Sequence, residues 1–154
     1  AKLSKRLRFD NASGKFILDE SQKNIGFVSG GIGITPLKSM IEYIMDKKLD
    51  CHAVLLYSNR LPEDIPFFEE LSQIRQKKLK IKIVLTVTKP EESKKPWSGK
   101  TGRIDEKMVQ EFLPKEALCY ICGPPAMVKA MKDVLRNCGF ADDKIKTELF
   151  TGYD

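Results

Sequence analysis

The chain has 154 residues, of which 42% are hydrophobic and 31% are charged, and its formal net charge is +6 at pH 7. This composition is typical of one globular domain with its own core, and no apolar run approaches the roughly 20 residues of a membrane span, so none is expected. The N-terminus is basic but lacks the apolar stretch of a secretory signal, and we therefore expect a cytoplasmic protein.

In chain order, the first features are an N-terminal arm, a strand and a helix. Residues 1–19 predict a small hairpin or an extended arm that stands outside the pattern that follows it. An apolar run predicts a buried strand at 24–29, and apolar side chains at helical spacing predict a helix at 36–48.

The turn between this strand and this helix, Ser29-Gly30-Gly31-Ile32-Gly33-Ile34-Thr35-Pro36, is the most informative segment of the chain. Its glycines let the backbone turn sharply and approach a ligand closely. Thr35 is expected to be the N-cap of the helix, and Pro36 suits the first helical turn. Because a helix N-terminus presents free N–H groups to an anion, the segment predicts a phosphate site.

Strands and helices keep alternating along the rest of the chain. The helix after the second strand has an apolar stripe that includes Phe68, and Gly139 is expected to cap the last helix. The long polar segment at 88–103 is expected to be a functional loop. The other predicted elements are a strand at 52–58, a helix at 63–77, a strand at 80–87, a helix at 105–112, a strand at 118–122, a helix at 125–138 and a strand at 145–150.

This alternation predicts an α/β fold, a doubly wound five-stranded parallel sheet in the order 3-2-1-4-5 with helices on both faces. Ligands of such folds bind beyond the carboxyl ends of the strands. Glycines, prolines and polar side chains follow all of the predicted strands, and we therefore expect a nucleotide-sized site there. These segments are Gly30 to Pro36, Ser58-Asn59-Arg60, Thr86 to Lys89, Cys122-Gly123-Pro124-Pro125 and Thr151-Gly152-Tyr153.

The four cysteines predict neither a metal site nor a disulfide. Cys119 and Cys122 have the spacing of a redox or zinc pair, but they lie on a predicted strand, where residues three apart face opposite sides. His52 is the only histidine, and Cys51 and Cys138 give no second pair at the spacing of a metal site.

Taken together, these segments resemble the pyridine-nucleotide half of the ferredoxin–NADP reductase superfamily, over about residues 15–154. The resemblance implies a domain that binds NADH or NADPH and passes hydride to FAD or FMN on a flavin-binding domain or subunit. A downstream electron-acceptor protein would be a further partner. The matching segments are the glycine-rich turn, Tyr57-Ser58-Asn59-Arg60 with Glu63-Asp64, Gly102-Arg103, Cys122-Gly123-Pro124 and Glu148.

The resemblance also implies roles for individual residues. The turn from Gly31 to Thr35 would cradle the pyrophosphate, and Thr35 and the Cys122-Gly123-Pro124 turn would frame the nicotinamide, with Cys122 beside the carbon that gives up hydride. Glu148 would face the flavin, so that Cys122, Thr35 and Glu148 are the expected catalytic residues. The other expected cofactor-binding residues are Gly30, Ser58, Asn59, Arg60, Asp64, Thr88, Lys89, Gly123, Pro124, Pro125 and Tyr153.

Two positions bear on the choice between NADH and NADPH. A carboxylate at the adenosine ribose binds its 2′-hydroxyl and repels a 2′-phosphate, whereas a cation does the reverse. Asp64 resembles the aspartate of NADH-using members, and Lys89 stands where NADPH-using members have an arginine. Because the match at Lys89 is inexact, NADH is the favoured nucleotide.

The flavin-binding half of the superfamily is not recognisable in this sequence. Its Arg-x-Tyr-Ser or Arg-x-Tyr-Thr signature has no counterpart, and the arm at 1–19 resembles the end of that lost barrel, followed by the nucleotide domain at 20–154. The chain therefore resembles a domain of a larger reductase or a short protein that acts beside a flavin subunit. Phe150 and Tyr153 are expected to expose apolar surface where the flavin domain docks.

Two alternatives of other classes remain open at this point. One is a stand-alone NAD(P)-binding or regulatory module without catalysis. The other is a nucleic-acid-binding protein that uses the lysines at 77–82 and 94–100. These lysines have no interleaved aromatic residue apart from Trp97, and no nucleic-acid-binding motif is present, so no nucleic-acid partner is expected.

Overall fold

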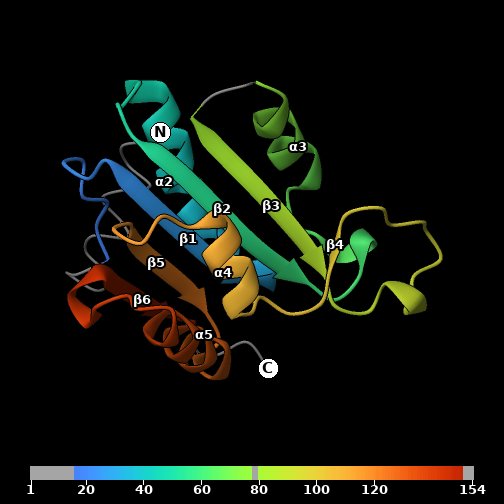
Figure 1. Cartoon of the computed structure of the whole chain (residues 1–154). Helices are drawn as coiled ribbons and strands as arrows, with labels where there is room; N and C mark the ends of the chain where they lie inside the picture. Colours follow the sequence, from blue (N-terminus) through green and yellow to red (C-terminus); the bar gives the residue numbers. More distant parts are fainter. Residues whose placement is uncertain (1–15, 78–79, 151–154) are drawn as a thin grey trace.

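The computed structural model describes residues 16–77 and 80–150, which form a parallel sheet covered by helices (Figure 1). The sheet has six strands in the order β4-β3-β2-β1-β5-β6. The strands are β1 (Asn24–Gly30), β2 (His52–Asn59), β3 (Ile81–Val87), β4 (Lys100–Thr101), β5 (Leu118–Gly123) and β6 (Ile145–Leu149), and the helices are α2 (Ile34–Lys47), α3 (Phe68–Gln76), α4 (Glu106–Phe112) and α5 (Pro125–Asn137).

The predicted doubly wound sheet is confirmed, but the predicted strand count is wrong. All five predicted strands are present, parallel and in the predicted order. The sixth strand, β4, lies within the polar segment at 88–103 and pairs only with Thr86 and Val87 at the end of β3. Its two residues are both exposed, so they carry no hydrophobic pattern that would reveal a strand.

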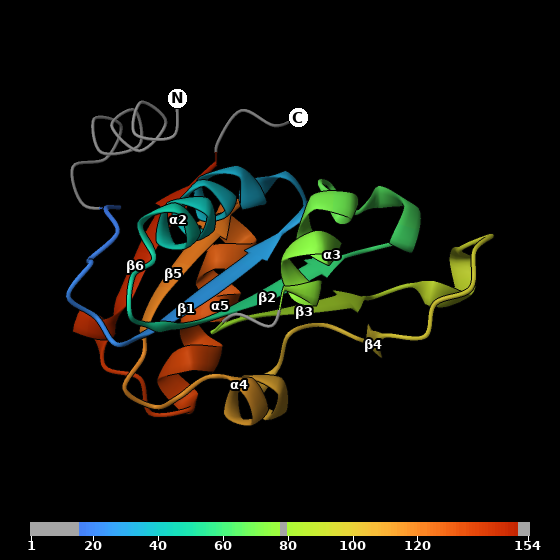
Figure 2. The ribbon, with the colours of Figure 1, turned by 90° about the horizontal axis from the view of Figure 1, so that it is seen from above.

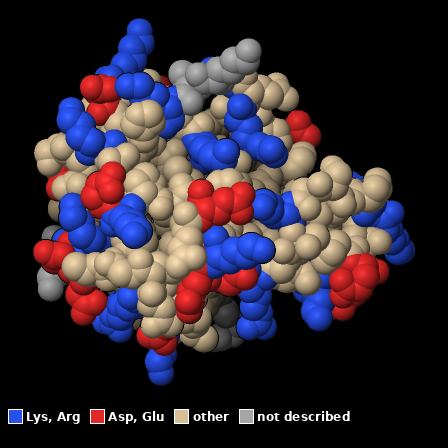
Figure 3. Space-filling model, viewed as in Figure 1, with Lys and Arg blue, Asp and Glu red and all other residues tan. Residues whose placement is uncertain are grey.

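Two helical layers cover the two faces of the sheet. Helices α2 and α3 lie on one face, and α4 and α5 lie on the other (Figure 2). Cys122 belongs to the core cluster under α2 and α3, whereas Cys119 belongs to the cluster under α4 and α5, so the two side chains face opposite sides of the sheet. Over the face that carries α4, Lys and Arg side chains are interspersed with Asp and Glu (Figure 3).

Two predicted helix starts differ from the structure. A short 3₁₀ turn, η1 (Gly31–Gly33), runs directly into α2, so that Gly33 is the N-cap and Thr35 is the second helical residue. The prediction that Thr35 caps this helix is therefore wrong. Helix α3 begins at Phe68, because Phe67 takes a left-handed conformation with φ of 58°. Phe68 is 39% exposed rather than part of a buried stripe.

The predicted cap of the last helix is confirmed. Gly139 has a φ of +95°, a conformation that favours glycine. Its N–H donates to the carbonyl oxygen of Arg136, and the N–H of Phe140 donates to that of Leu135, which is the Schellman pattern.

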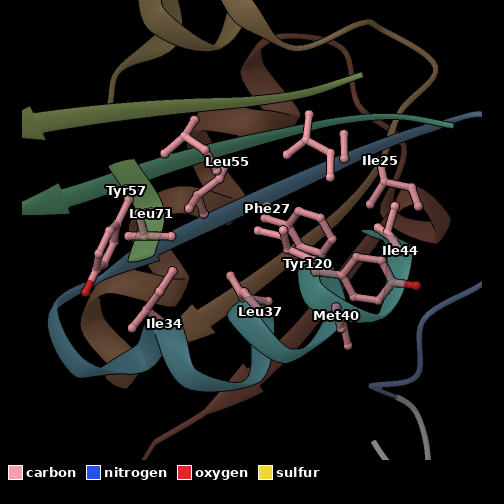
Figure 4. Packing of buried hydrophobic residues seen from close by; sticks show 14 of the residues in the cluster. Ile25, Phe27, Ile34, Leu37, Met40, Ile44, Leu55, Tyr57, Leu71 and Tyr120 are labelled. Atoms are coloured by element: carbon pink, nitrogen blue, oxygen red, sulfur yellow. The ribbon is translucent and has the colours of Figure 1, made fainter. Parts of the chain in front are cut away.

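The start of the described chain packs into the main core. Phe16 and Leu18 are both buried in the cluster under α2. Tyr120 on β5 lies beside Phe27, as Figure 4 shows, and its hydroxyl donates to the carbonyl oxygen of Ile17 at 2.7 Å. Residues 1–15 and 151–154, and with them most of the predicted arm, lie outside the described part of the chain.

Candidate functional site

The glycine-rich turn joins the centre of the sheet to the first turn of α2. Gly31 has a φ of +57°, and a Cβ there would meet no described atom within 4 Å, so backbone conformation rather than space favours glycine. At Gly33 the reason is space, since a Cβ would lie 2.6 Å from the carbonyl oxygen of Cys122. No side chain caps α2, which leaves its first N–H groups available to an anion.

Two buried hydroxyls hold this turn in place. The hydroxyl of Tyr57 donates a hydrogen bond to the carbonyl oxygen of Gly31. The Oγ of Ser29 donates to the carbonyl oxygen of Cys122 at 2.9 Å, which links the end of β1 to the end of β5. Neither residue was predicted as a site residue. The sequence signal that could have identified both residues is a polar side chain within an otherwise apolar, buried strand, because such a group needs a hydrogen-bond partner.

Strand pairing brings two of the three expected catalytic residues together. Cys122 on β5 is paired in register with Glu148 on β6. Cys122 is fully buried, and this burial, with a smaller contribution from the charge of Glu148, raises the pKa of its thiol to about 12. The thiol is therefore neutral at physiological pH. Thr35, the third residue, is exposed in the first turn of α2, two residues after the glycine that packs against the Cys122 carbonyl.

The buried thiols predict a loss of stability in alkaline solution. Burial raises the pKa of both Cys119 and Cys122 from 9.0 to about 12. The unfolded chain releases these protons first, so the stabilisation is fully present below about pH 9 and is lost as the pH rises towards 12. Each thiol contributes a slope of up to about 1.4 kcal/mol per pH unit.

Urea unfolding between about pH 8 and pH 10.5 measures this slope. Burial also raises the pKa of the Cys51 and Cys138 thiols and of the Tyr57 and Tyr120 hydroxyls, which add to the slope. Cys119→Ala is therefore expected to reduce the slope by less than half, whatever it does to stability at neutral pH. A free energy of unfolding that stays constant over this range would contradict the buried placement of the thiols.

A cavity of about 750 Å³ opens beside the glycine-rich turn. It lies over the carboxyl ends of β1, β2 and β3, where Gly30, Ser58 and Thr88 line it. Its other walls come from the residues that lead into α4, from Arg103 to Lys107, and from α5, where Met127 lines it. Strand order reverses between β1 and β5, the switch point at which open α/β sheets bind their ligands, and the cavity borders this point at Gly30 and Met127.

Several other predicted residues lie near the carboxyl ends of the strands. Arg60 is exposed and pairs with Glu92, and the N–H of Lys89 donates to the carbonyl oxygen of Arg60 at 2.9 Å. Asp64 is exposed on the 3₁₀ turn at Pro62–Asp64 and is not among the residues that line the cavity. Asn59 is buried, and its Nδ2 has no hydrogen-bond partner among residues 16–77 and 80–150.

The other predicted positions are at the helix starts and the chain end. Ile32 is 49% exposed, whereas Ile34 is buried. Gly123 is buried at the end of β5, and Pro124 and Pro125 are exposed at the start of α5. Phe150 packs partly buried against the core under α2, so the prediction that it exposes apolar surface is not supported. Tyr153 lies outside the described residues.

The cavity walls include two residues, Arg103 and Met127, that the sequence did not mark as site residues. Arg103 belongs to a recognised motif but was given no function, and Met127 was assigned only to the apolar stripe of its helix. One of the wall residues has a separate structural role. Asp105 is the N-cap of α4, and its carboxylate accepts a hydrogen bond from the N–H of Met108.

Two features are absent from the described part of the chain. None of its helices is both long and apolar enough to cross a membrane. The same residues contain no cluster of three or more His, Cys, Asp or Glu side chains that would bind a metal ion. The candidate site consists of backbone amides, hydroxyls and a few charged side chains.

Comparison with known proteins gives consistent matches. Residues 27–133 match the family described as oxidoreductase NAD-binding domain. A nitrate reductase [NADPH] of Emericella nidulans is 37% identical over 130 residues, covering 80% of this chain and 14% of that protein. A glycine betaine monooxygenase reductase subunit of Chromohalobacter salexigens is 33% identical, covering 87% of this chain and 37% of that protein.

A solved structure agrees with these relatives. The cytochrome b5 reductase domain of Ulva prolifera nitrate reductase superimposes with a TM-score of 0.73 at 28% identity, covering 82% of this chain and 50% of that one. The chain thus spans half or less of the length of each of these three proteins.

Proposed function

The chain belongs to the oxidoreductase NAD-binding domain family, and we propose that it binds NADH or NADPH and presents the nicotinamide to FAD or FMN on a flavin-binding domain or subunit. One observation carries the proposal. The uncapped N-terminus of α2 and a cavity of about 750 Å³ lie at the same end of the sheet, where Gly30 of the glycine-rich turn lines the cavity. Transfer of electrons to a downstream acceptor protein belongs to the same proposal.

The residues present fit a dinucleotide. The first turn of α2 supplies backbone N–H groups for the pyrophosphate, and Gly31 leaves open space beside the backbone there. The cavity between α4 and α5 is large enough for the adenosine, with the exposed Arg103 on its wall and Ser58 at its floor. The Nδ2 of the buried Asn59, which forms no hydrogen bond within 3.5 Å among the described residues, is a further donor at the same strand end.

The nucleotide, when bound, supplies a hydride from its nicotinamide ring, and the chain supplies orientation and shielding from water. Cys122 contributes a neutral, buried thiol rather than a thiolate, because burial raises its pKa. It therefore offers an apolar contact and holds its proton. Glu148 is half-buried and in register with Cys122, and its negative charge also acts to raise the pKa of that thiol.

The choice between the two nucleotides is also part of the proposal. The sequence favours NADH through Asp64, but this carboxylate is not among the cavity residues, whereas Arg103 and Lys107 are. The preference for NADH therefore stays a prediction. Comparing the affinities of NADH and NADPH for Asp64→Asn tests it, since a carboxylate at the ribose requires this variant to improve NADPH relative to NADH.

A nucleotide titration tests the proposed function. Amide shifts followed by NMR during titration with NADH and then NADPH are expected to centre on residues 30–35 and on the cavity residues. The absorbance of the same sample reports any bound flavin. If neither nucleotide shifts these amides, the proposal fails for the chain alone. Binding that a flavin-bearing partner never converts into flavin reduction would instead favour a stand-alone NAD(P)-binding module.

The cavity wall provides a more specific prediction. Arg103→Glu places a negative charge on the wall of the cavity that is expected to hold the adenosine of the anionic nucleotide, and it is expected to weaken nucleotide binding about tenfold. Lys115→Glu is the matched control, because it makes the same charge change at an exposed residue in the turn before β5. This turn lies at the amino ends of the parallel strands, away from the cavity at their carboxyl ends. Isothermal titration of the two variants compares them, and equal losses would show that only net charge matters.

A further inference from the structure

Strand β3 has an open edge along most of its length. Strand β4 pairs only with Thr86 and Val87, so residues 81–85 have no neighbouring strand on that side within the described chain (Figure 1). The carbonyl oxygen of Val87 accepts a hydrogen bond from the N–H of Gly102, which fixes the direction of this edge. With a period of two, the N–H and C=O groups of Ile83 and Leu85 point the same way.

A groove of about 250 Å³ runs along this open edge. One rim is formed by Arg75 of α3 and by Trp97, which packs against the core under α2 and α3. The other rim is formed by Lys82 and by Phe112 of α4, which packs against the core on the opposite face. Figure 2 shows α3 and α4 on opposite sides of β3, so the strand edge forms the floor between two aromatic rims.

The groove is basic. The Nζ atoms of Lys82 and Lys100 each lie 5.2 Å from the ring centre of Phe112. Glu111 pairs with Lys100 at 3.3 Å. Arg75 and Lys82 form no ion pair within 4 Å among residues 16–77 and 80–150, so no carboxylate neutralises these two cations beside the strand edge.

We propose that this groove binds an extended acidic segment of another protein as an added β-strand. The backbone of the segment would pair with Ile83 and Leu85, because strand addition satisfies the open edge. Its side chains would alternate between the Trp97 rim and the Phe112 rim. The cations on both rims then select carboxylates over neutral or basic side chains.

The charges also argue against a second copy of this chain as the occupant. Pairing two such edges would bring Arg75 and Lys82 of one copy close to those of the other, and lysine on an edge strand disfavours self-pairing for this reason. The groove shares no residue with the cavity beside the glycine-rich turn. The inference therefore stands independently of nucleotide binding.

The test uses a fluorescein-labelled peptide of alternating aspartate and valine with blocked ends. Fluorescence anisotropy is expected to show saturable binding to the full chain, and amide NMR is expected to shift residues 81–85. Lys82→Glu is expected to weaken binding about tenfold, because it places a like charge beside the peptide. Lys129→Glu, the same charge change at an exposed residue of α5, is expected to change binding by less than about twofold.

Peptide chemistry separates strand addition from simple charge attraction. Only alternate amides of an added strand face β3, so N-methylation of one alternate set is expected to abolish binding and methylation of the other set to leave it intact. The proposal is overturned by an absence of saturable binding, by equal losses in Lys82→Glu and Lys129→Glu, or by binding that ignores both methylated peptides. Nucleotide titration of the same samples reports the other site separately.

Discussion

Gly33→Ala is expected to destabilise the chain and to impair nucleotide binding together. A Cβ at this position would lie 2.6 Å from the carbonyl oxygen of Cys122 and 2.9 Å from the Cα of Gly123. Both atoms belong to the backbone of β5, so no side chain can move aside to make room. Overpacking of this kind costs about 1–3 kcal/mol. The glycine-rich turn must shift away from β5, and α2 must shift with it.

The functional effect of Gly33→Ala follows from the same movement. The N–H groups at the start of α2 leave the positions that suit the pyrophosphate, and nucleotide affinity is expected to fall by about tenfold or more, which corresponds to about 1.4 kcal/mol. Urea unfolding measures the stability, and isothermal titration with NADH measures the affinity. Retained affinity in a destabilised variant would mean that the phosphate site does not depend on the contact with β5.

The neighbouring glycines are matched controls for this prediction. A Cβ at Gly30 would lie 3.5 Å from the carbonyl oxygen of Ser58, an ordinary contact, so Gly30→Ala is expected to retain stability. Gly31→Ala meets open space but must adopt a φ of +57°, which costs roughly 1–2 kcal/mol of backbone strain. The three variants therefore separate close packing, backbone strain and the mere addition of a methyl group.

The strand and helix order was predictable because each element has a strong local signal. Strands such as β1 and β5 are apolar on both faces, which is the pattern of a buried parallel sheet. Helix α5 carries a clear apolar stripe, and the glycine after it marks its end. Right-handed crossovers then leave few topologies, and the predicted order of these strands is the observed one.

The errors arise where tertiary structure overrides local pattern. Thr35 precedes a proline, as an N-cap often does, but the 3₁₀ turn before it moves the helix start to Ile34. Strand β4 exists only because a polar loop returns alongside β3. The cavity walls were missed for a similar reason, since Arg103 and Met127 are brought together only by the packing of α4 and α5.

Tyr120→Ala is expected to cause the largest loss of stability among the changes considered. The ring stacks on Phe27 at 5.7 Å between ring centres and meets the edge of Phe16 at 5.4 Å. Its buried hydroxyl donates to the carbonyl oxygen of Ile17 and accepts from the N–H of Asp19 at 2.8 Å. Removing a buried aromatic ring costs about 3–5 kcal/mol, because a cavity replaces it.

Tyr120→Phe separates the ring from the hydroxyl. It keeps both ring contacts but leaves the Ile17 carbonyl and the Asp19 N–H without their partner, at an expected cost of about 1–3 kcal/mol. A cycle that combines Tyr120→Ala with Phe16→Ala is expected to show a coupling of about 0.5–1.5 kcal/mol for the ring pair. Urea unfolding measures all four free energies.

Measuring nucleotide affinity tests whether the contacts of Tyr120 with residues 16–19 matter for function. Tyr120 lies two residues before Cys122 on the same strand, but its side chain points into the core under α2, where it holds residues 16–19 against the sheet. Tyr120→Phe is therefore expected to leave NADH affinity unchanged while it loosens this segment. If affinity falls with stability, then the nucleotide site and the entry of the chain into the sheet form one cooperative unit. If affinity is unchanged, the glycine-rich turn and the end of β5 suffice for the site, and residues 16–19 serve to fix the chain that leads into it.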